Sequence, residues 1–142
     1  MTNLLIPVGM TEKEYFETVA SEVDFLKWYK EQDLPTYETP SVTADMVAYC
    51  FVEGQLKLLA IRRKAHPYQH CLALVGGFVN KDEDATHACI REVKEEVGLD
   101  LPVNKVEQLM TVSTPGRDPR GWVITIAHLV YLPAEAVDLA HA

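Results

Sequence analysis

The sequence has few cysteines and no long apolar run. Its 142 residues include three cysteines, an odd number, and Cys50, Cys71 and Cys89 form no CxxC pair. This set predicts neither a disulfide framework nor a zinc site, and it favours a reducing compartment. No apolar stretch approaches the ~18 residues of a membrane span, and the first residues lack the pattern of a signal peptide. We therefore expect a cytoplasmic protein with no membrane partner.

The sequence is also short of basic residues. It carries 13 Lys and Arg against 21 Asp and Glu, a net charge of −8 at pH 7. A protein that binds the phosphate backbone of a nucleic acid shows a basic excess. We therefore expect no nucleic-acid partner within these 142 residues. A small substrate with phosphates fits this charge only if a metal or a local basic cluster neutralises it.

Residues 1–41 are expected to form a helical arm and a connector. Thr11 and Glu14 match the capping box that starts a helix. Apolar residues then recur at intervals of three and four, as on one face of a helix: Phe16, Val19, Val23 and Leu26. Two prolines in the segment 35–40 end this helix. The apolar stripe must be covered by its own core or by a partner subunit, and we expect a homodimer.

Residues 42–142 are expected to form one domain with a single core. The pattern predicts a helix over 82–97, which Gly98 ends as a C-cap. It predicts strands over 46–52, 55–61, 109–112 and 122–132. Strands and helices mix without strict alternation, which indicates an α/β (α+β) class. The tail 133–142 shows no closing helix, and whether the natural chain continues stays open.

Three glutamates of the predicted helix lie on one face. At about 100° per residue, Glu95 and Glu96 fall near −60° and +40° from Glu92. Like charges at these spacings cost a few tenths of a kcal/mol per pair. Hard oxygen ligands of this kind are the ones that Mg²⁺ and Mn²⁺ take. The helix alone leaves two interpretations open, a divalent-metal site and a solvated acidic face.

A longer pattern surrounds these glutamates. Gly77 is followed after five residues by Glu83, and after seven more by Arg91-Glu92-Val93-Lys94-Glu95-Glu96-Val97-Gly98-Leu99. This string resembles the Nudix box, G-x5-E-x7-R-E-U-x-E-E-x-G-U with U an apolar residue, and it fills every fixed position. Seven fixed identities match by chance with a probability on the order of 10⁻⁶ in a chain this long. One departure is Leu74-Val75-Gly76-Gly77, where the family often has Leu-Pro-Gly-Gly.

The resemblance implies an α/β/α sandwich with a mixed sheet and a bound Mg²⁺ or Mn²⁺. Glu92 and Glu96 would be the principal metal ligands. Glu95 would ligate directly or through water, and the Gly77 carbonyl would supply another oxygen. The implied reaction is attack of water on a diphosphate that links a nucleoside to another group. In that reaction the metal neutralises phosphate charge and lowers the pKa of the attacking water.

The resemblance also assigns two positioning roles. Arg91 would orient the carboxylates through charge-assisted hydrogen bonds, and Glu83 would brace the junction between loop and helix. We therefore group Arg91 and Glu83 with Glu92 and Glu96 as the candidate catalytic set. The general base stays open, because relatives use either a glutamate of the box or a glutamate on a later loop. Glu135 is the one acid near the last strand that fits the second possibility.

A turn-rich loop over 114–121 carries a second distinctive string. It reads Pro-Gly-Arg-Asp-Pro-Arg-Gly-Trp from position 115. Guanidinium groups suit phosphate oxygens, so Arg117 and Arg120, with Asp118, are candidate substrate-binding residues. Arg63 in an earlier basic loop is a fourth, and an ordinary surface turn is the alternative for both loops. The string resembles the loop of a bacterial Nudix subgroup linked to NAD metabolism, whose members bind ADP-ribose or close relatives.

Three functions are compatible with these resemblances. The complete acidic set favours an ADP-ribose pyrophosphatase, which releases AMP and ribose 5-phosphate from this small nucleotide. The second function is the ADP-ribose-sensing Nudix-like domain of a transcriptional regulator of NAD metabolism, whose DNA-binding domain would lie outside the 142 residues. The third is a house-cleaning nucleotide pyrophosphatase, which shares the box and usually lacks the arginine loop.

Overall fold

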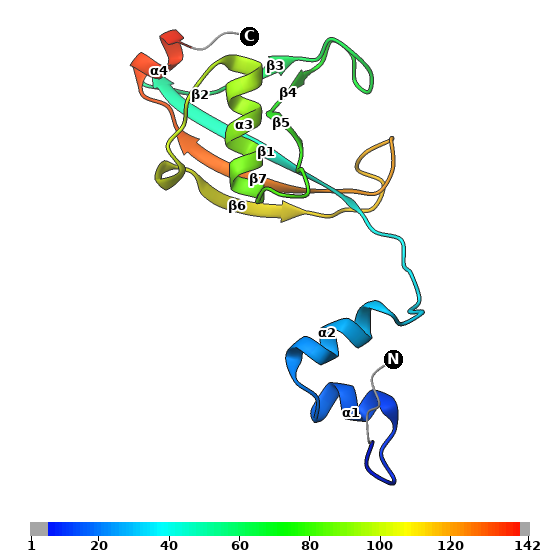
Figure 1. Cartoon of the computed structure of the whole chain (residues 1–142). Helices are drawn as coiled ribbons and strands as arrows, with labels where there is room; N and C mark the ends of the chain where they lie inside the picture. Colours follow the sequence, from blue (N-terminus) through cyan, green and yellow to red (C-terminus); the bar gives the residue numbers. More distant parts are fainter. Residues whose placement is uncertain (1–5, 140–142) are drawn as a thin grey trace. The chain divides into compact units, whose positions relative to one another are not determined.

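The chain divides into two compact units, residues 1–38 and residues 39–142, and the computed structural model describes residues 6–139 (Figure 1). The smaller unit contains the helices α1 (Glu12–Thr18) and α2 (Glu22–Lys30). The larger unit contains the strands and the helix that carries the glutamates.

The prediction of a single N-terminal helix is wrong, because the chain interrupts it between α1 and α2. Ser21 begins α2 as an N-cap, and its hydroxyl accepts a hydrogen bond from the Asp24 amide at 3.2 Å. The two helices then fold back on each other, which stacks the rings of Phe16 and Trp28 with their centroids 5.0 Å apart. A serine cap and an aromatic stack therefore outweigh the continuous helical periodicity of the sequence.

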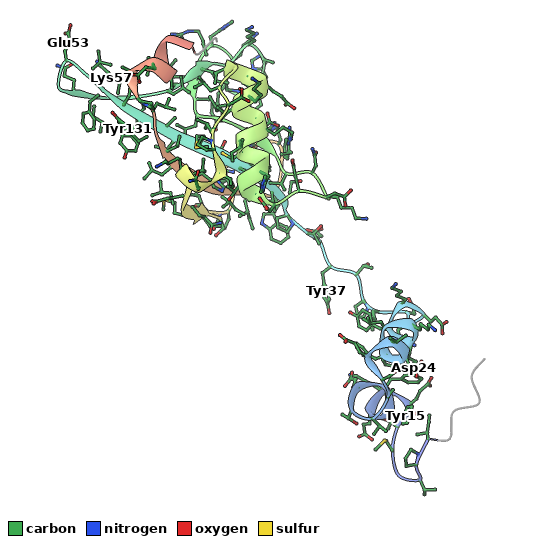
Figure 2. All side chains as sticks on the ribbon, turned by 60° about the vertical axis from the view of Figure 1, so that its left-hand side comes forward. Tyr15, Asp24, Tyr37, Glu53, Lys57 and Tyr131 are labelled. Carbon is green, nitrogen blue, oxygen red and sulfur yellow. The ribbon has the colours of Figure 1, made fainter. Side chains whose placement is uncertain are left out.

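The capping box at the start of α1 is confirmed. The Thr11 hydroxyl accepts from the Glu14 amide at 3.1 Å, and the Glu14 carboxylate accepts from the Thr11 amide at 2.9 Å. Of the predicted apolar stripe, only the first residue is buried. Val19, Val23 and Leu26 remain exposed in the described structure. The side chains of this unit are drawn in Figure 2.

Five strands of the larger unit form a mixed sheet, which confirms the predicted fold class. They are β1 (Ser41–Val52), β2 (Gln55–Leu58), β5 (Val75–Phe78), β6 (Glu107–Val112) and β7 (Val123–Tyr131). The strand order is β2-β1-β7-β6, and β5 also pairs with β1. β1 and β7 are parallel, whereas the other pairs are antiparallel. β2 and β5 pair with different stretches of β1, and Glu53 and Lys57 mark the β1–β2 hairpin in Figure 2.

A second, two-stranded sheet joins β3 (Ile61–Arg62) to β4 (Leu72–Ala73). The predicted hairpin strand over 55–61 is thus split, because β2 ends at Leu58 and the residues from Ile61 pair with β4 instead of β1. The segment between β3 and β4 forms a loop beside β5, where it becomes one wall of the cleft described below.

Helix α3 (Ala85–Val97) covers one face of the sheet and contacts β1, β5 and β7 (Figure 1). It begins later than predicted because Asp84 is the N-cap, with its carboxylate 2.8 Å from the His87 amide. It ends at Gly98 as predicted, in the left-handed conformation with φ of 76°. The core lies between α3 and the sheet, and includes Ala44, Met46, Ala48, Val75, Val93, Val97 and Val130.

The prediction that no helix follows the last strand is wrong. After Pro133 the chain forms α4 (Ala134–Leu139). A short 3₁₀ helix, η1 (Val103–Lys105), lies between α3 and β6. Proline is favoured where a helix starts, because its missing amide hydrogen costs nothing there. None of the helices within residues 6–139 combines the length and the hydropathy that crossing a bilayer would require.

Candidate functional site

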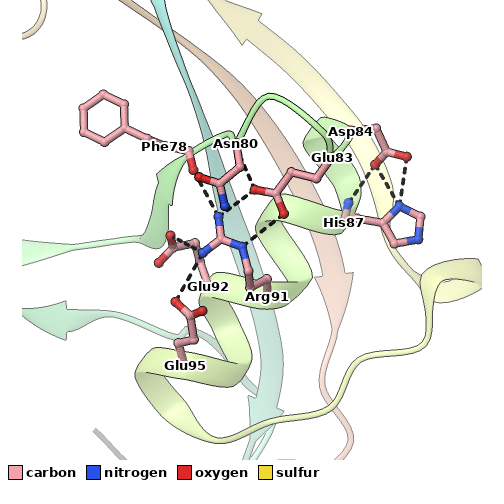
Figure 3. A network of polar contacts seen from close by, with 8 residues as sticks. All are labelled: Phe78, Asn80, Glu83, Asp84, His87, Arg91, Glu92 and Glu95. Carbon is pink, nitrogen blue, oxygen red and sulfur yellow. Dashed lines mark hydrogen bonds and ion pairs between the residues drawn. The ribbon is translucent and has the colours of Figure 1, made fainter.

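Arg91, in the middle of α3, is the centre of a polar network (Figure 3). Its Nη2 donates to the Glu83 carboxylate at 2.7 Å and to the Phe78 carbonyl at 3.1 Å. Its Nη1 donates to Glu92 at 2.9 Å and to Glu95 at 3.2 Å. One guanidinium therefore connects β5, the loop before α3 and two glutamates of the helix. Arg91 thus contacts two of the three glutamates that the resemblance expects it to orient.

Glu83 is held in its charged form. Besides two hydrogen bonds from Arg91, its carboxylate accepts one from the Asn80 amide at 2.9 Å. The Arg91 hydrogen bonds, followed by that from Asn80, lower the pKa of Glu83. Glu83 thus links the loop between β5 and α3 to the middle of the helix.

The glycine pair of β5 makes room for two carboxylates on opposite sides of the strand. A Cβ at Gly77 would overlap the Glu92 carboxylate, and a Cβ at Gly76 would overlap Asp45. Successive residues of a strand point to opposite faces. Glu92 therefore lies on the α3 side of β5, and Asp45 lies on the other side.

Glu96 completes the acidic pair beside Gly77. Burial, and next the charge and hydrogen bond of Glu92, raise the pKa of Glu96 to about 7, although the Gly76 amide donates a hydrogen bond to it. Two partly buried carboxylates in contact repel each other when both are ionised. A positive charge placed between them would relieve this repulsion.

The chemistry of the donor set fits a hard divalent cation. Glu92 and Glu96 converge beside Gly77, whereas Glu95 is exposed and turned toward Arg91. Within residues 6–139, no three His, Cys, Asp or Glu side chains gather around one point as metal ligands. Mg²⁺ commonly takes one or two carboxylates and completes its shell with water and substrate phosphate. The carboxylates of Glu92 and Glu96, which lie next to the glycine pair of β5, match that requirement.

A cleft of about 590 Å³ lies against β1 and β5 on the side that bears Asp45. All four predicted substrate-binding residues line it: Arg63, Arg117, Asp118 and Arg120. Gly76 and Gly77 line it as well, so the cleft reaches the strand edge where Glu92 lies. The structure therefore brings the arginine loop and the glutamate helix to the same segment of β5.

Two arginines of the cleft are held in place by contacts with other residues of the protein. Asp118 pairs with Arg120 at 2.8 Å, and these hydrogen bonds lower the pKa of Asp118 to about 2. The Arg120 guanidinium also lies 5.2 Å from the centre of the Phe78 ring. Arg117 donates to the Val123 carbonyl at 3.3 Å. These contacts fix the loop while leaving other guanidinium donors available for a ligand.

Sequence reasoning missed Asp45 and misplaced one candidate. Asp45 lies within β1, and the available signal was that it is the one charged residue of that strand. Glu135, considered as a general base, lies on α4 and does not line the cleft. Shortly before α4, the Leu132 amide donates a hydrogen bond to the Tyr49 carbonyl, which lies four residues beyond Asp45 along β1. Glu135 is therefore placed toward the opposite end of that strand.

The family model of the NUDIX domain matches residues 42–140. The chain belongs to the NUDIX family. An ADP-ribose pyrophosphatase of Methanocaldococcus jannaschii is 42% identical to it over 108 residues, which cover 73% of this chain and 60% of that protein. The ADPR responsive transcriptional repressor NtrR of Acinetobacter baylyi is 35% identical over 119 residues, covering 82% of this chain and 46% of the repressor.

A solved NUDIX structure has the same fold. The MutT/nudix family protein from Enterococcus faecalis superposes with a TM-score of 0.81 and 47% sequence identity, over 91% of this chain and 52% of that one. The chain thus spans less than two thirds of the length of each of these relatives. Their similarity confirms the family and the fold of the predicted box.

Proposed function

We propose that this NUDIX chain hydrolyses ADP-ribose to AMP and ribose 5-phosphate with Mg²⁺ or Mn²⁺. The observation that carries the proposal is the contact of Glu92 with Glu96 beside the glycine pair of β5, which also lines a cleft with three arginines. Arg91 donates a hydrogen bond to the Glu92 member of this pair. Similarity to a protein named as an ADP-ribose pyrophosphatase supports this substrate. The cleft volume of about 590 Å³ is in the range typical of small-molecule sites.

The residues on the α3 side of β5 would hold the cation. Glu92 and Glu96 would hold the cation, with the Gly77 carbonyl and Glu95 as further candidate oxygen donors. When bound, the cation supplies charge neutralisation at the diphosphate and acidifies water. Arg91 keeps Glu92 in place through its 2.9 Å hydrogen bond.

On the cleft side, guanidinium groups bind phosphate. Arg117 and Arg120 line the cleft with donors beyond their internal contacts, and Arg63 lies on the facing wall. Asp118 keeps Arg120 over Phe78 and so positions it. A diphosphate at the β5 edge would lie between these arginines and the glutamate pair.

The direct test is product analysis with ADP-ribose and Mg²⁺, beside nucleoside diphosphate sugars and oxidised nucleoside triphosphates. We expect AMP release from ADP-ribose and a loss of about 100-fold or more in kcat/KM for Glu92→Gln and Glu96→Gln. Glu107→Gln, on the exposed strand β6, is the matched control and should keep full activity. Equal turnover in all variants would remove the glutamate pair from the mechanism. Faster cleavage of oxidised triphosphates would favour the house-cleaning function.

A ligand-sensing role is the second candidate, because this chain also resembles a repressor described as ADPR responsive. A sensor would bind ADP-ribose at the same cleft without consuming it. Tight binding of ADP-ribose with no AMP released in the presence of Mg²⁺ or Mn²⁺ would favour this role over hydrolysis.

We also propose that the chain forms a homodimer through the apolar stripe of the smaller unit, and that it works in the cytoplasm. Val23 and Leu26 are exposed in the smaller unit, and exposed apolar residues of this kind favour an interface. The three cysteines are unpaired, which suits the reducing conditions of the cytoplasm. Light scattering should give twice the chain mass. Leu26→Asp should yield monomers while the control Lys30→Ala should not, and a monomeric wild-type protein would contradict the dimer.

A further inference from the structure

Asp45 is a charged side chain on the floor of the cleft, separate from the glutamate pair. It lies on β1 directly opposite Gly76 of β5, and its Oδ1 lies where a Cβ of Gly76 would be. The cleft is lined by Asp45 together with Thr43 on the same face of β1. Glu92 lies on the other side of β5, although Asp45 is near enough for its charge to add to the effects of burial and of Glu92 that raise the pKa of Glu96.

The Asp45 carboxylate is held in a fixed position. The Thr125 hydroxyl, on the neighbouring strand β7, donates a hydrogen bond to Oδ2. Thr43 and Thr125 are direct partners in the β1–β7 ladder and are both buried. The carboxylate therefore sits on rigid sheet rather than on a loop, with Oδ1 directed over Gly76.

The charge of Asp45 is not compensated in the described structure. The cleft lining contains two acids, Asp45 and Asp118. Asp118 is neutralised by Arg120 through hydrogen bonds of 2.8 and 3.1 Å. By contrast, no ion pair within residues 6–139 involves Asp45, although three arginines line the same cleft. A partly buried carboxylate without a cation retains the capacity to accept further hydrogen bonds.

This charge restricts what can lie over Asp45. A phosphate placed there would be repelled, whereas a hydroxyl or an amino group would donate to Oδ1 and gain a charge-assisted hydrogen bond. The phosphates of a bound ligand therefore belong beside the arginines and the β5 edge. The part of the ligand over Asp45 must carry a neutral hydrogen-bond donor.

We propose that Asp45 is a specificity-determining residue, which accepts a hydrogen bond from a hydroxyl or amino donor on the nucleoside or sugar part of a nucleoside diphosphate. This inference rests on the proposed function, because it assigns a subsite to the same cleft. Sites built around a buried polar group discriminate strongly against ligands that lack the matching donor. Asp45 thus selects ligands by their donor groups, while the arginines bind the phosphates that all such ligands share.

The test is a comparison of ligands across variants, measured by calorimetry in EDTA so that no hydrolysis occurs. The ligands are ADP-ribose, its inosine form, which lacks the exocyclic amine, and the two forms that lack a 2-hydroxyl on one ribose. The wild-type protein should bind one of the three analogues at least about tenfold more weakly than ADP-ribose. Asp45→Ala and Asp45→Asn should erase that preference, and the analogue concerned identifies the donor as amine or hydroxyl.

Thr125→Val is the companion variant, because it removes the hydroxyl that fixes Asp45 and keeps the side-chain shape. It should reduce the same preference partly. A uniform loss of affinity for all four ligands in Asp45→Ala, or an unchanged preference among them, would overturn the assignment of Asp45. The proposed function would be unaffected in that case, provided that the wild-type protein hydrolyses ADP-ribose. Failure of the wild-type protein both to bind and to hydrolyse ADP-ribose would overturn the proposed function and this inference together.

Discussion

Arg91 and Glu83 are joined by two hydrogen bonds, of 2.7 and 3.1 Å, across the loop that leads into α3. Both side chains are largely shielded from water, with 29% and 17% of their surface exposed. The pair therefore couples the folding of the box to the orientation of Glu92, which the same guanidinium contacts. Arg91 therefore contributes both to the stability of the fold and to the position of a candidate metal ligand.

Removal of either partner should impair both stability and activity. Glu83→Gln and Arg91→Ala should each lower the free energy of unfolding, because each variant leaves a charged group of the network without its partner. Urea denaturation measures this, and the double variant should cost less than the sum of the two single variants. Lys94→Ala on the same helix is the control, since its 2.8 Å pair with Asp100 is exposed and should contribute less than about 1 kcal/mol. Additive effects of the two box variants would contradict the coupling.

Gly77 should tolerate no side chain. Gly77→Ala would press a methyl group into the Glu92 carboxylate, so we expect weaker Mn²⁺ binding and a large loss of hydrolysis. Gly54→Ala is the comparison variant, because Gly54 has a positive φ but open space around it. It should lower stability by about 1 kcal/mol and leave metal binding unchanged. If Gly77→Ala binds Mn²⁺ as the wild-type protein does, the close packing of Glu92 on the strand has no functional role.

The raised pKa of Glu96 predicts a pH-dependent penalty in the metal-free protein. Its pKa rises from 4.5 to about 7 on folding, so the folded state holds a proton that the unfolded state releases. Stability therefore falls as pH rises between these two values. Glu96→Gln removes the penalty, and in EDTA it should be stabilised relative to wild type by about 1 kcal/mol more at pH 8 than at pH 4.5, after allowance for solvent screening. Parallel stability curves for the two proteins would contradict this.

The arginine loop should affect substrate binding more than the chemical step. Arg117→Ala is expected to raise KM for ADP-ribose more than it lowers kcat, because phosphate contacts bind ground and transition states alike. Arg120→Ala should behave similarly, and Asp118→Ala should reproduce part of its effect by releasing Arg120 from Phe78. Steady-state kinetics at saturating metal measures the split. An unchanged KM in Arg117→Ala would return this loop to the role of a surface turn.

The box and the helix that carries it were predictable from sequence because their signals are local. Gly98 ends α3 as expected, and Arg91 pairs with Glu95 at the i, i+4 spacing of one helix face. The helical wheel also explains why Glu92 and Glu96 are partly buried. The buried residues Ala88 and Val93 flank Glu92 at about −40° and +100°, so this glutamate faces the sheet rather than solvent.

Other features depend on contacts that no local pattern reveals. The break between α1 and α2 follows from the stacking of Phe16 on Trp28, twelve positions apart. Asp45 becomes part of the cleft only through its pairing with Gly76, thirty-one positions later in the chain. The divergence of Glu95 from the other glutamates depends on the Arg91 network.

The central claim is that Glu92 and Glu96 together hold one divalent cation beside Gly77. Titration of the protein with Mn²⁺, followed by calorimetry or by the paramagnetic signal of the free ion, tests it most directly. The account predicts saturable binding by the wild-type protein, retained in Glu107→Gln and lost in both Glu92→Gln and Glu96→Gln. Binding of equal strength in all four proteins, or no binding in any, would contradict it.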